Sequence, residues 1–470
     1  MRYVSTRGEA PPLGFIDAML AGLARDGGLY VPESWPTLAP PQIAALAGRP
    51  YAEVALEVIR PFASGLNEGQ LARTAREAYE GFRHPAVTPL VQVGPGTFVL
   101  ELFHGPTLAF KDLAMQLLAR LMDQALEERG DRATIVVATS GDTGGAAVEA
   151  FRGCRRIDLV VLYPQGRVSE VQRRMMTTPD DPNVHAVAVE GTFDDCQALV
   201  KALFNHHAFR DRVRLSAVNS INWARIVAQV VYYFVAAVAL GAPQRRVAFT
   251  VPTGNFGDVF AGYVALRMGL PIDRLVIATN TNDILARTLS AGRYEIRDVV
   301  PTVSPSMDIQ VSSNFERLLF DAYGRDANAV RHLMGSLAQS RRFDIAGPAL
   351  KAIRADFSAD HASEEETAAT IRTLRKESGY LADPHTAVAL AVAEKEARDP
   401  AVPMVVLSTA HPAKFPDAVE AACGVRPELP DWLAHLVSRP ERITVLPVDQ
   451  NALEQFVLAA SRAAREGAAA

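Results

Sequence analysis

Cysteine is scarce in this sequence. Three cysteines, Cys154, Cys196 and Cys423, occur in 470 residues. They stand far apart and lack the paired spacing of metal sites and disulfide frameworks. We therefore expect free thiols in a reducing compartment, with no disulfide and no metal.

Long apolar runs are also missing. The longest, residues 226–240, contains Gln229 and is shorter than the roughly 20 residues that span a bilayer. A buried central helix is the better interpretation. The N-terminus has Arg7, Glu9 and two adjacent prolines where a signal peptide would need an apolar segment, so the predicted location is cytoplasmic.

Charge of neither sign dominates. The chain has 48 basic and 53 acidic residues, a formal net charge of -5, and no long basic run. This balance argues against a general attraction to nucleic acid or to anionic membranes. A small molecule is the expected partner, and since no pattern requires subunit association, we expect a monomer.

Short apolar runs alternate with helix-like segments along the chain, which predicts an α/β fold with parallel sheets flanked by helices. The length suffices for two to four domains. Strands are expected at residues 133–140, 158–162, 184–189, 213–218, 246–252, 274–278 and 404–407. A helix is expected from Lys111 to a glycine cap at Gly130, and another after a capping box formed by Ser363 and Glu366.

Lys111 follows a glycine-proline turn and directly precedes the first of these helices. Leu108, Ala109 and Phe110 are apolar, and apolar surroundings favour the neutral amine, the form that attacks an aldehyde. This setting is typical of a lysine that forms a Schiff base. The alternative is an ordinary solvated surface lysine, which is the commoner case.

Two glycine-rich turns each join a strand-like run to a helix-like one, at residues 141–145 and 253–257. The free N–H groups and the helix dipole at such a turn suit an anion. Either turn alone, however, is more often an ordinary connection between a strand and a helix. Together with Lys111 they indicate pyridoxal 5'-phosphate: the lysine would hold its aldehyde, one loop its phosphate, and the other the substrate carboxylate.

These motifs belong to a larger set by which the chain resembles the threonine synthase family of the long bacterial and fungal type. The set comprises residues 3–8, 23–32, 103–112, 139–144, 219–226, 252–258, 383–387 and 408–415, in the family's order. The resemblance implies a tryptophan-synthase-β-like, fold type II pyridoxal phosphate enzyme with two lobes and a family-specific N-terminal domain. The expected domains are the N-terminal domain (1–85), the lobe with the lysine (86–215), the lobe with the cofactor phosphate loop (216–430) and a C-terminal extension (431–470).

The resemblance also implies roles for single residues. Lys111 would be the catalytic Schiff-base lysine, and the other cofactor-binding residues would be Thr253, Gly254, Asn255, Phe256, Gly257, Thr409 and Asp142. Thr409 would face the pyridine nitrogen and Asp142 the 3′-oxygen. The substrate carboxylate would be bound by Ser140, Gly141, Thr143 and Gly144.

A group of donors at residues 219–225 suits the phosphate of a substrate. These donors are Asn219, Ser220, Asn222 and Arg225, at the start of the expected central helix. Ordinary N-cap and surface contacts would explain Ser220 and Asn222 equally well, but Arg225 less well. His385 and His411 are expected to make local cap or backbone contacts, although His411 is also a candidate acid or base.

The reaction implied is conversion of O-phospho-L-homoserine and water to L-threonine and phosphate, the last step of threonine biosynthesis. Because water must enter at one stage only, closure of the lobes is expected. Three alternatives remain: a phospholyase that releases 2-oxobutyrate, a serine or threonine dehydratase, and a non-catalytic binding protein. Residues 219–225 argue against the dehydratase and Lys111 against the binding protein.

Overall fold

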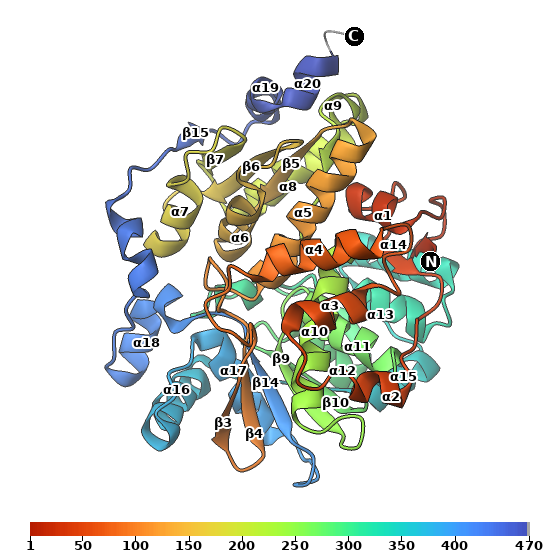
Figure 1. Ribbon diagram of the computed structural model, residues 1–470, viewed down its shortest axis with the longest axis vertical. Helices are drawn as coiled ribbons and strands as arrows, with labels where there is room; N and C mark the ends of the chain where they lie inside the picture. Colours follow the sequence, from red (N-terminus) through yellow and green to blue (C-terminus); the bar gives the residue numbers. More distant parts are fainter. Residues whose placement is uncertain (468–470) are drawn as a thin grey trace.

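The computed structural model describes residues 1–467, which form two α/β lobes with an N-terminal segment packed along one side (Figure 1). In this described part, no helix is long and apolar enough to cross a membrane. Nor do three or more His, Cys, Asp or Glu side chains gather there as a metal site would require.

The larger sheet has six strands in the order β13-β10-β9-β14-β4-β3. They are β3 (Leu90–Gly94), β4 (Thr97–Glu101), β9 (Val247–Pro252), β10 (Ile272–Thr279), β13 (Phe357–His361) and β14 (Met404–Ser408). All neighbours are parallel except the β3–β4 hairpin. Since β4, β14 and β9 are parallel neighbours, the loops after their carboxyl ends emerge at one edge of the sheet, where ligands bind in open α/β sheets.

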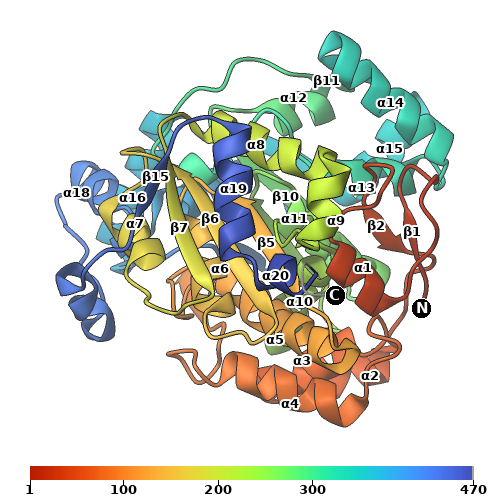
Figure 2. The same cartoon turned by 90° about the horizontal axis from the view of Figure 1, so that it is seen from above.

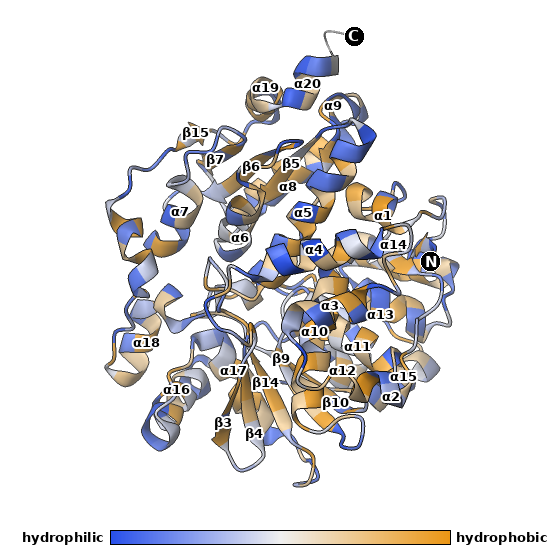
Figure 3. Ribbon diagram, in the orientation of Figure 1, coloured by the Kyte–Doolittle hydropathy of each residue, from blue (hydrophilic) through white to orange (hydrophobic). Residues whose placement is uncertain are grey.

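Helices cover both faces of this sheet. Ala248, Val276 and Val406 pack with α17, whereas the alternate residues Phe249 and Leu275 pack with α10 and α11. Burial on both faces explains the nearly continuous apolar strand sequences, which Figure 3 shows in orange. The helices of this lobe are α10 (Trp223–Ala239), α11 (Gly257–Arg267), α12 (Ile284–Ala291), α13 (Phe315–Ala322), α14 (Ala327–Ser340), α15 (Gly347–Asp356), α16 (Glu364–Ser378), α17 (Pro384–Lys395) and α18 (Pro416–Cys423), with the 3-10 turns η1 (Pro305–Met307) and η2 (Pro412–Lys414) and the short antiparallel pair β11 (Arg293–Glu295) and β12 (Arg342–Asp344).

The smaller sheet is wholly parallel, with the order β15-β7-β6-β5-β8. Its strands are β5 (Ala133–Ala138), β6 (Ile157–Pro164), β7 (Val184–Val189), β8 (Leu215–Ser216) and β15 (Thr444–Leu446). Its helices are α5 (Lys111–Arg129), α6 (Asp142–Phe151), α7 (Glu170–Thr177), α8 (Phe193–Asn205), α9 (His207–Arg212), η3 (Asp431–Ser438), α19 (Gln450–Ala460) and α20 (Arg462–Gly467). Figure 2 shows α19 beside α8, against which it packs.

The N-terminal segment contacts both lobes. It comprises β1 (Tyr3–Ser5), β2 (Tyr30–Pro32), α1 (Phe15–Ala21), α2 (Pro40–Ala44), α3 (Tyr51–Ile59) and α4 (Glu68–Tyr79). Helix α3 packs on α10 and α4 packs on α5. The rings of Tyr3, Trp35 and Phe62 surround Trp223 at the start of α10, so this segment helps to hold the two lobes together.

The expected α/β fold is confirmed, and so are its local details. Gly130 ends α5 in the left-handed conformation, at φ 67°, and the Ser363 side chain accepts from the N–H of Glu366. The central helix is buried along almost its whole length. The strand expected at 213–218 is reduced to Leu215–Ser216, because residues 213–214 form the turn that follows α9.

The sheets do not follow the domain boundaries expected from the sequence. β3 and β4 lie within 86–215, yet they extend the sheet of the following lobe, where β4 pairs with β14. β15 lies within 431–470, yet it pairs with β7 and extends the smaller sheet. Pairing between distant strands is set by packing of the whole fold and leaves no local trace in the sequence.

Candidate active site

Lys111 is the first residue of α5, at the junction of the lobes. The N–H of the preceding Phe110 donates to the carbonyl oxygen of Thr409 at 2.8 Å, which ties this loop to the end of β14. The Lys111 side chain is only 12% exposed. Burial lowers its pKa to about 8, although the Asp142 carboxylate acts in the opposite sense. Lys111 is therefore not the solvated surface lysine of the alternative.

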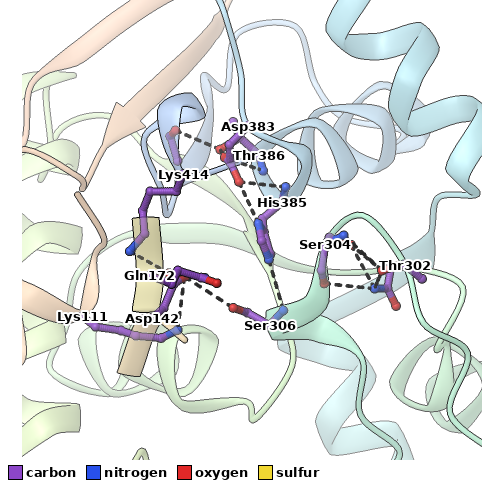
Figure 4. A network of polar contacts seen from close by, with 12 residues as sticks. Lys111, Asp142, Gln172, Thr302, Ser304, Ser306, Asp383, His385, Thr386 and Lys414 are labelled. Atoms are coloured by element: carbon purple, nitrogen blue, oxygen red, sulfur yellow. Dashed lines mark hydrogen bonds and ion pairs between the residues drawn. The ribbon is translucent and has the colours of Figure 1, made fainter. Parts of the chain in front are cut away.

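Asp142 lies between two lysines (Figure 4). Its Oδ1 is 2.6 Å from the Nζ of Lys414, and its Oδ2 is 3.6 Å from the Nζ of Lys111. Gln172 Nε2 donates to Oδ1 at 3.0 Å and the Ser306 hydroxyl to Oδ2 at 3.5 Å. Burial would raise the pKa of Asp142, but the two ammonium groups outweigh it and hold the pKa well below its usual range. The carboxylate is thus anionic.

The loop after β9 has the geometry of an anion cradle. Among the described residues, none accepts a hydrogen bond from the backbone N–H of Gly254, Asn255, Phe256 or Gly257. The loop carbonyls are held instead: Ser312 donates to Gly254 O at 2.6 Å, and the Asn314 amide to Asn255 O at 2.9 Å. A side chain at Gly254 would meet the carbonyl oxygen of Ser306 at 2.8 Å, so only glycine fits there. Free N–H groups at the start of α11 suit a phosphate.

The loop after β5 is partly closed by its own hydrogen bonds. Thr139 Oγ1 accepts from the N–H of Gly141 at 2.9 Å and of Gly144 at 2.8 Å. Those two amides are therefore engaged within the protein. In the described part of the chain, the N–H groups of Ser140, Asp142 and Thr143 have no acceptor, and they remain as anion donors.

Arg225 is a buried cation without an anion. Its residue is 2% exposed, and no carboxylate in residues 1–467 lies within ion-pair distance of it. Nη1 donates to the carbonyl oxygen of Val218 at 3.2 Å, and Nε has no hydrogen-bond partner in this part of the chain. Burial lowers its pKa to about 10, still well above neutral pH. Arg225 also lowers the pKa of Lys111, so the two charges share one region.

The other members of the group at 219–225 differ from one another. Asn219 is exposed and Ser220 half-buried, and neither side chain is engaged within residues 1–467. Asn222 is buried and caps α10: its amide donates to Met19 O and Ala217 O, each at 2.9 Å, and its oxygen accepts from Ala224 N–H. Both amide protons of Asn222 are used inside the protein, so the N-cap alternative accounts for this residue.

Thr409 and Thr253 end neighbouring strands of the larger sheet. Thr409 is 7% exposed and directly follows β14. Thr253 follows β9, and its hydroxyl donates to Val251 O at 2.6 Å. Its hydroxyl proton is therefore used within its own strand, and its backbone N–H donates to Ala278 O at 2.8 Å. Both hydrogen-bond donors of Thr253 are thus engaged inside the protein.

Sequence reasoning missed several residues that build this site. Lys414 is fully buried and lay unassigned in the motif at 408–415. Ser306, Ser312 and Asn314 belong to one segment that supports the phosphate cradle, and no motif indicated it. His385, as expected, makes cap contacts: its Nδ1 is 2.7 Å from the N-cap Asp383, and its Nε2 accepts from Ser306 N–H at 3.3 Å. His411 likewise accepts from Ala413 N–H at 3.1 Å.

Together these parts form one site at the junction of the lobes. It offers a nucleophilic amine, two sets of free N–H groups and a buried guanidinium. This set fits a phosphorylated aldehyde together with a substrate that carries a carboxylate and a second anionic group. The donors match the chemistry of pyridoxal phosphate.

Comparison with known proteins defines the class. Residues 82–410 match the family described as "Pyridoxal-phosphate dependent enzyme", so the chain is a member of that class. Residues 2–79 and 386–457 match "Threonine synthase N terminus" and "Threonine synthase, C-terminal". The chain belongs to the threonine synthase family.

Individual relatives agree over nearly the whole chain. Threonine synthase of Pseudomonas aeruginosa is 53% identical, over 97% of this chain and 98% of that protein. The crystal structure of threonine synthase from Brucella melitensis with bound PLP is 62% identical and has a TM-score of 0.96, covering 98% of this chain and 100% of that one. Yeast threonine synthase is 37% identical with a TM-score of 0.92, covering 99% of each chain.

Proposed function

We propose that this protein converts O-phospho-L-homoserine and water to L-threonine and inorganic phosphate with pyridoxal phosphate as cofactor. The observation that carries the proposal is the buried Arg225, which has no anionic partner among residues 1–467 and lies near the amine of Lys111. An enzyme that acts on a phosphorylated substrate would need a buried cation for the substrate phosphate, and would need it close to the reactive amine.

Lys111 would hold the cofactor aldehyde, and the N–H groups of residues 254–257 would hold its phosphate. Thr253 would shape the start of this loop, because its N–H and its hydroxyl are bonded within the protein. Thr409 would lie toward the pyridine nitrogen, where a neutral hydroxyl would leave that nitrogen less firmly protonated than a carboxylate would. Bound in this way, the cofactor supplies an electron sink for the negative charge that develops at the substrate α-carbon.

The substrate carboxylate binds at the loop after β5. The N–H groups of Ser140 and Thr143 and their hydroxyls are the donors, whereas Gly141 and Gly144 shape the loop, because their amides are bonded to Thr139. Asp142 lies beside the Lys111 amine and orients it through their 3.6 Å contact.

The substrate phosphate binds at the start of α10. Arg225 supplies charge, and Ser220 and Asn219 supply neutral donors, with Asn222 fixing the helix end that presents them. Donors on the leaving phosphate stabilise the charge that develops as it departs. Lys111 Nζ would act as the base that moves the proton of the substrate α-carbon.

Product analysis tests the proposal directly. The purified protein loaded with pyridoxal phosphate is incubated with O-phospho-L-homoserine, with Lys111→Ala as the control. Equal amounts of threonine and phosphate from the wild type alone are expected. Phosphate with 2-oxobutyrate would identify a phospholyase instead, and absence of turnover with bound cofactor would overturn the substrate assignment.

We further propose that the enzyme acts as a monomer in the cytoplasm and has no nucleic-acid partner. Three free cysteines and the near balance of charges support a reducing compartment and a small-molecule partner. Light scattering coupled to size-exclusion chromatography tests the first point, and a mass of 50.8 kDa is expected.

A further inference from the structure

Lys414 is an unusual lysine for this chain. Only six lysines occur in the whole sequence; four of them are exposed, and the other two are Lys111 and Lys414. Lys414 is 0% exposed. Its Nζ donates to Thr107 O at 2.9 Å and lies 2.6 Å from Asp142 Oδ1. A buried ammonium persists only when it is paired and hydrogen-bonded, and these two partners satisfy it.

The same contacts change what Asp142 does to Lys111. Asp142 lies closer to Lys414 than to Lys111, at 2.6 Å against 3.6 Å. The electrostatic attraction of two charges falls with distance, and Lys414 also fixes the orientation of the carboxylate. Lys111 therefore faces a neutralised pair rather than a free anion.

We propose that Lys414 is a positioning residue: it engages the Asp142 carboxylate and so keeps this carboxylate from holding the Lys111 amine in its protonated form. Without Lys414, the carboxylate would turn to Lys111 and hold it as an ammonium, which does not react with an aldehyde. The importance of this effect rests on the proposed function, which needs Lys111 as a neutral amine.

The remaining groups around the cluster agree with this role. Burial is the largest influence that lowers the pKa of Lys111. The positive charge of Arg225 lowers the pKa of Lys111 further. Asp112, adjacent in sequence, is buried and accepts from both the N–H and the hydroxyl of Thr107. Burial raises the pKa of Asp112 to about 6, with Lys414 acting in the opposite sense and Glu149 in the same sense. Near neutral pH, Asp112 is bonded to Thr107 and does not compete for Lys111.

The test is a double-mutant cycle on the protein without cofactor, in which lysine is labelled with carbon-13 and nitrogen-15. Six lysines give few NMR signals, and the signal of Lys111 is identified by its loss in Lys111→Arg. The titration midpoint of Lys111 is measured in wild type, Lys414→Met, Asp142→Asn and the double variant. Lys414→Gln, which keeps a donor for Thr107, replaces Lys414→Met if that variant does not fold.

Lys414→Met is expected to raise the Lys111 midpoint by about one pH unit, which corresponds to roughly tenfold slower imine formation with pyridoxal at pH 7. In the Asp142→Asn background, the same substitution is expected to raise the midpoint by less than half as much. Equal shifts in both backgrounds would mean simple repulsion between the lysines and would overturn the proposal, as would an unchanged or lowered midpoint in Lys414→Met. A wild type that titrates as expected but makes no threonine would overturn the proposed function alone.

Discussion

The guanidinium of Arg225 donates to the carbonyl oxygen of Val218 at 3.2 Å and makes no ion pair within residues 1–467. A buried charge held by one neutral acceptor is costly to the folded protein. Such a cost is expected where a ligand supplies the missing anion, and it leads to the first prediction.

Replacing Arg225 by methionine should weaken use of the phosphorylated substrate without destabilising the protein. Loss of a charged hydrogen bond to the phosphate is expected to lower kcat/KM by roughly 10- to 100-fold, while the melting temperature without ligand stays the same or rises. Steady-state kinetics and thermal unfolding measure the two effects.

Arg317 is the matched control for that substitution, because it is also buried but each of its three guanidinium nitrogens donates a hydrogen bond within the protein. It donates to Tyr30 O at 3.0 Å and to Ile221 O at 2.6 Å, and also to the side chain of Asn314. Arg317→Met should lower the melting temperature. If both variants lost equal stability, the role of Arg225 would be structural.

Ser312 should support the cofactor phosphate loop from behind. Its hydroxyl donates to Gly254 O at 2.6 Å, so Ser312→Ala leaves that carbonyl without a partner and lets the loop relax. A lost hydrogen bond of about 1 kcal/mol predicts roughly fivefold weaker binding of pyridoxal phosphate. Titration of the cofactor-free protein by absorbance measures it. The adjacent, half-buried Ser313, with a 3.4 Å contact to Asn255 Oδ1, is the control, and Ser313→Ala should bind normally.

Asp258 should make stability depend on pH. It is buried on α11 and accepts from the hydroxyls of Tyr232 at 2.5 Å and Tyr233 at 3.0 Å. Its second oxygen has no partner within the described chain. Burial raises its pKa from 3.8 to about 7, although the tyrosine hydrogen bonds act in the opposite sense. Between these two pH values the folded protein keeps a proton that the unfolded chain has lost, so its stability falls as the pH rises.

Asp258→Asn removes this proton uptake. The melting temperature of the variant minus that of the wild type should therefore increase from pH 5 to pH 7, by an amount equivalent to on the order of a few kcal/mol in the free energy of unfolding. Differential scanning calorimetry across this range provides the comparison. A difference that stays constant with pH would contradict the prediction.

Gly141 should not tolerate a side chain. Its φ is 139°, and an added Cβ would collide with the Gln172 side chain that donates to Asp142. Gly141→Ala is expected to cost about 1 to 3 kcal/mol of stability and to reduce activity by displacing Gln172. Gly145, in the helix α6 of the same motif, is the control: its Cβ would lie 3.4 Å from Met175, an ordinary contact, so Gly145→Ala should remain stable and active.

Much of this molecule was predictable from local sequence. The cap at Gly130, the capping box at Ser363 and the strand at 184–189 were all expected where the structure has them. These features depend on residues within a few positions of one another, so the local sequence is sufficient to predict them. The lysine and the two glycine loops were expected for the same reason.

The contacts between distant residues were not predictable. Lys414 and its acceptor Thr107 are 307 residues apart, and the contact of Ser306 with Asp142 joins the two lobes. The strand β15 completes a sheet whose other strands lie far earlier in the chain. Each depends on strand order and on how the lobes meet, which no short segment encodes.

The sequence by itself therefore determined the α/β class and the helices with their caps, because periodicity, turns and apolar neighbours act locally. It predicts Lys111 as the reactive lysine from signals of the same local kind. The tertiary structure alone decided which charges face one another. In the part of the chain that the structure describes, Arg225 lies buried without an ion pair, Asn222 uses its amide as a helix cap, and Lys414 engages Asp142 beside Lys111. The energy of a buried charge depends on its surroundings in three dimensions, and those exist only once the chain has folded.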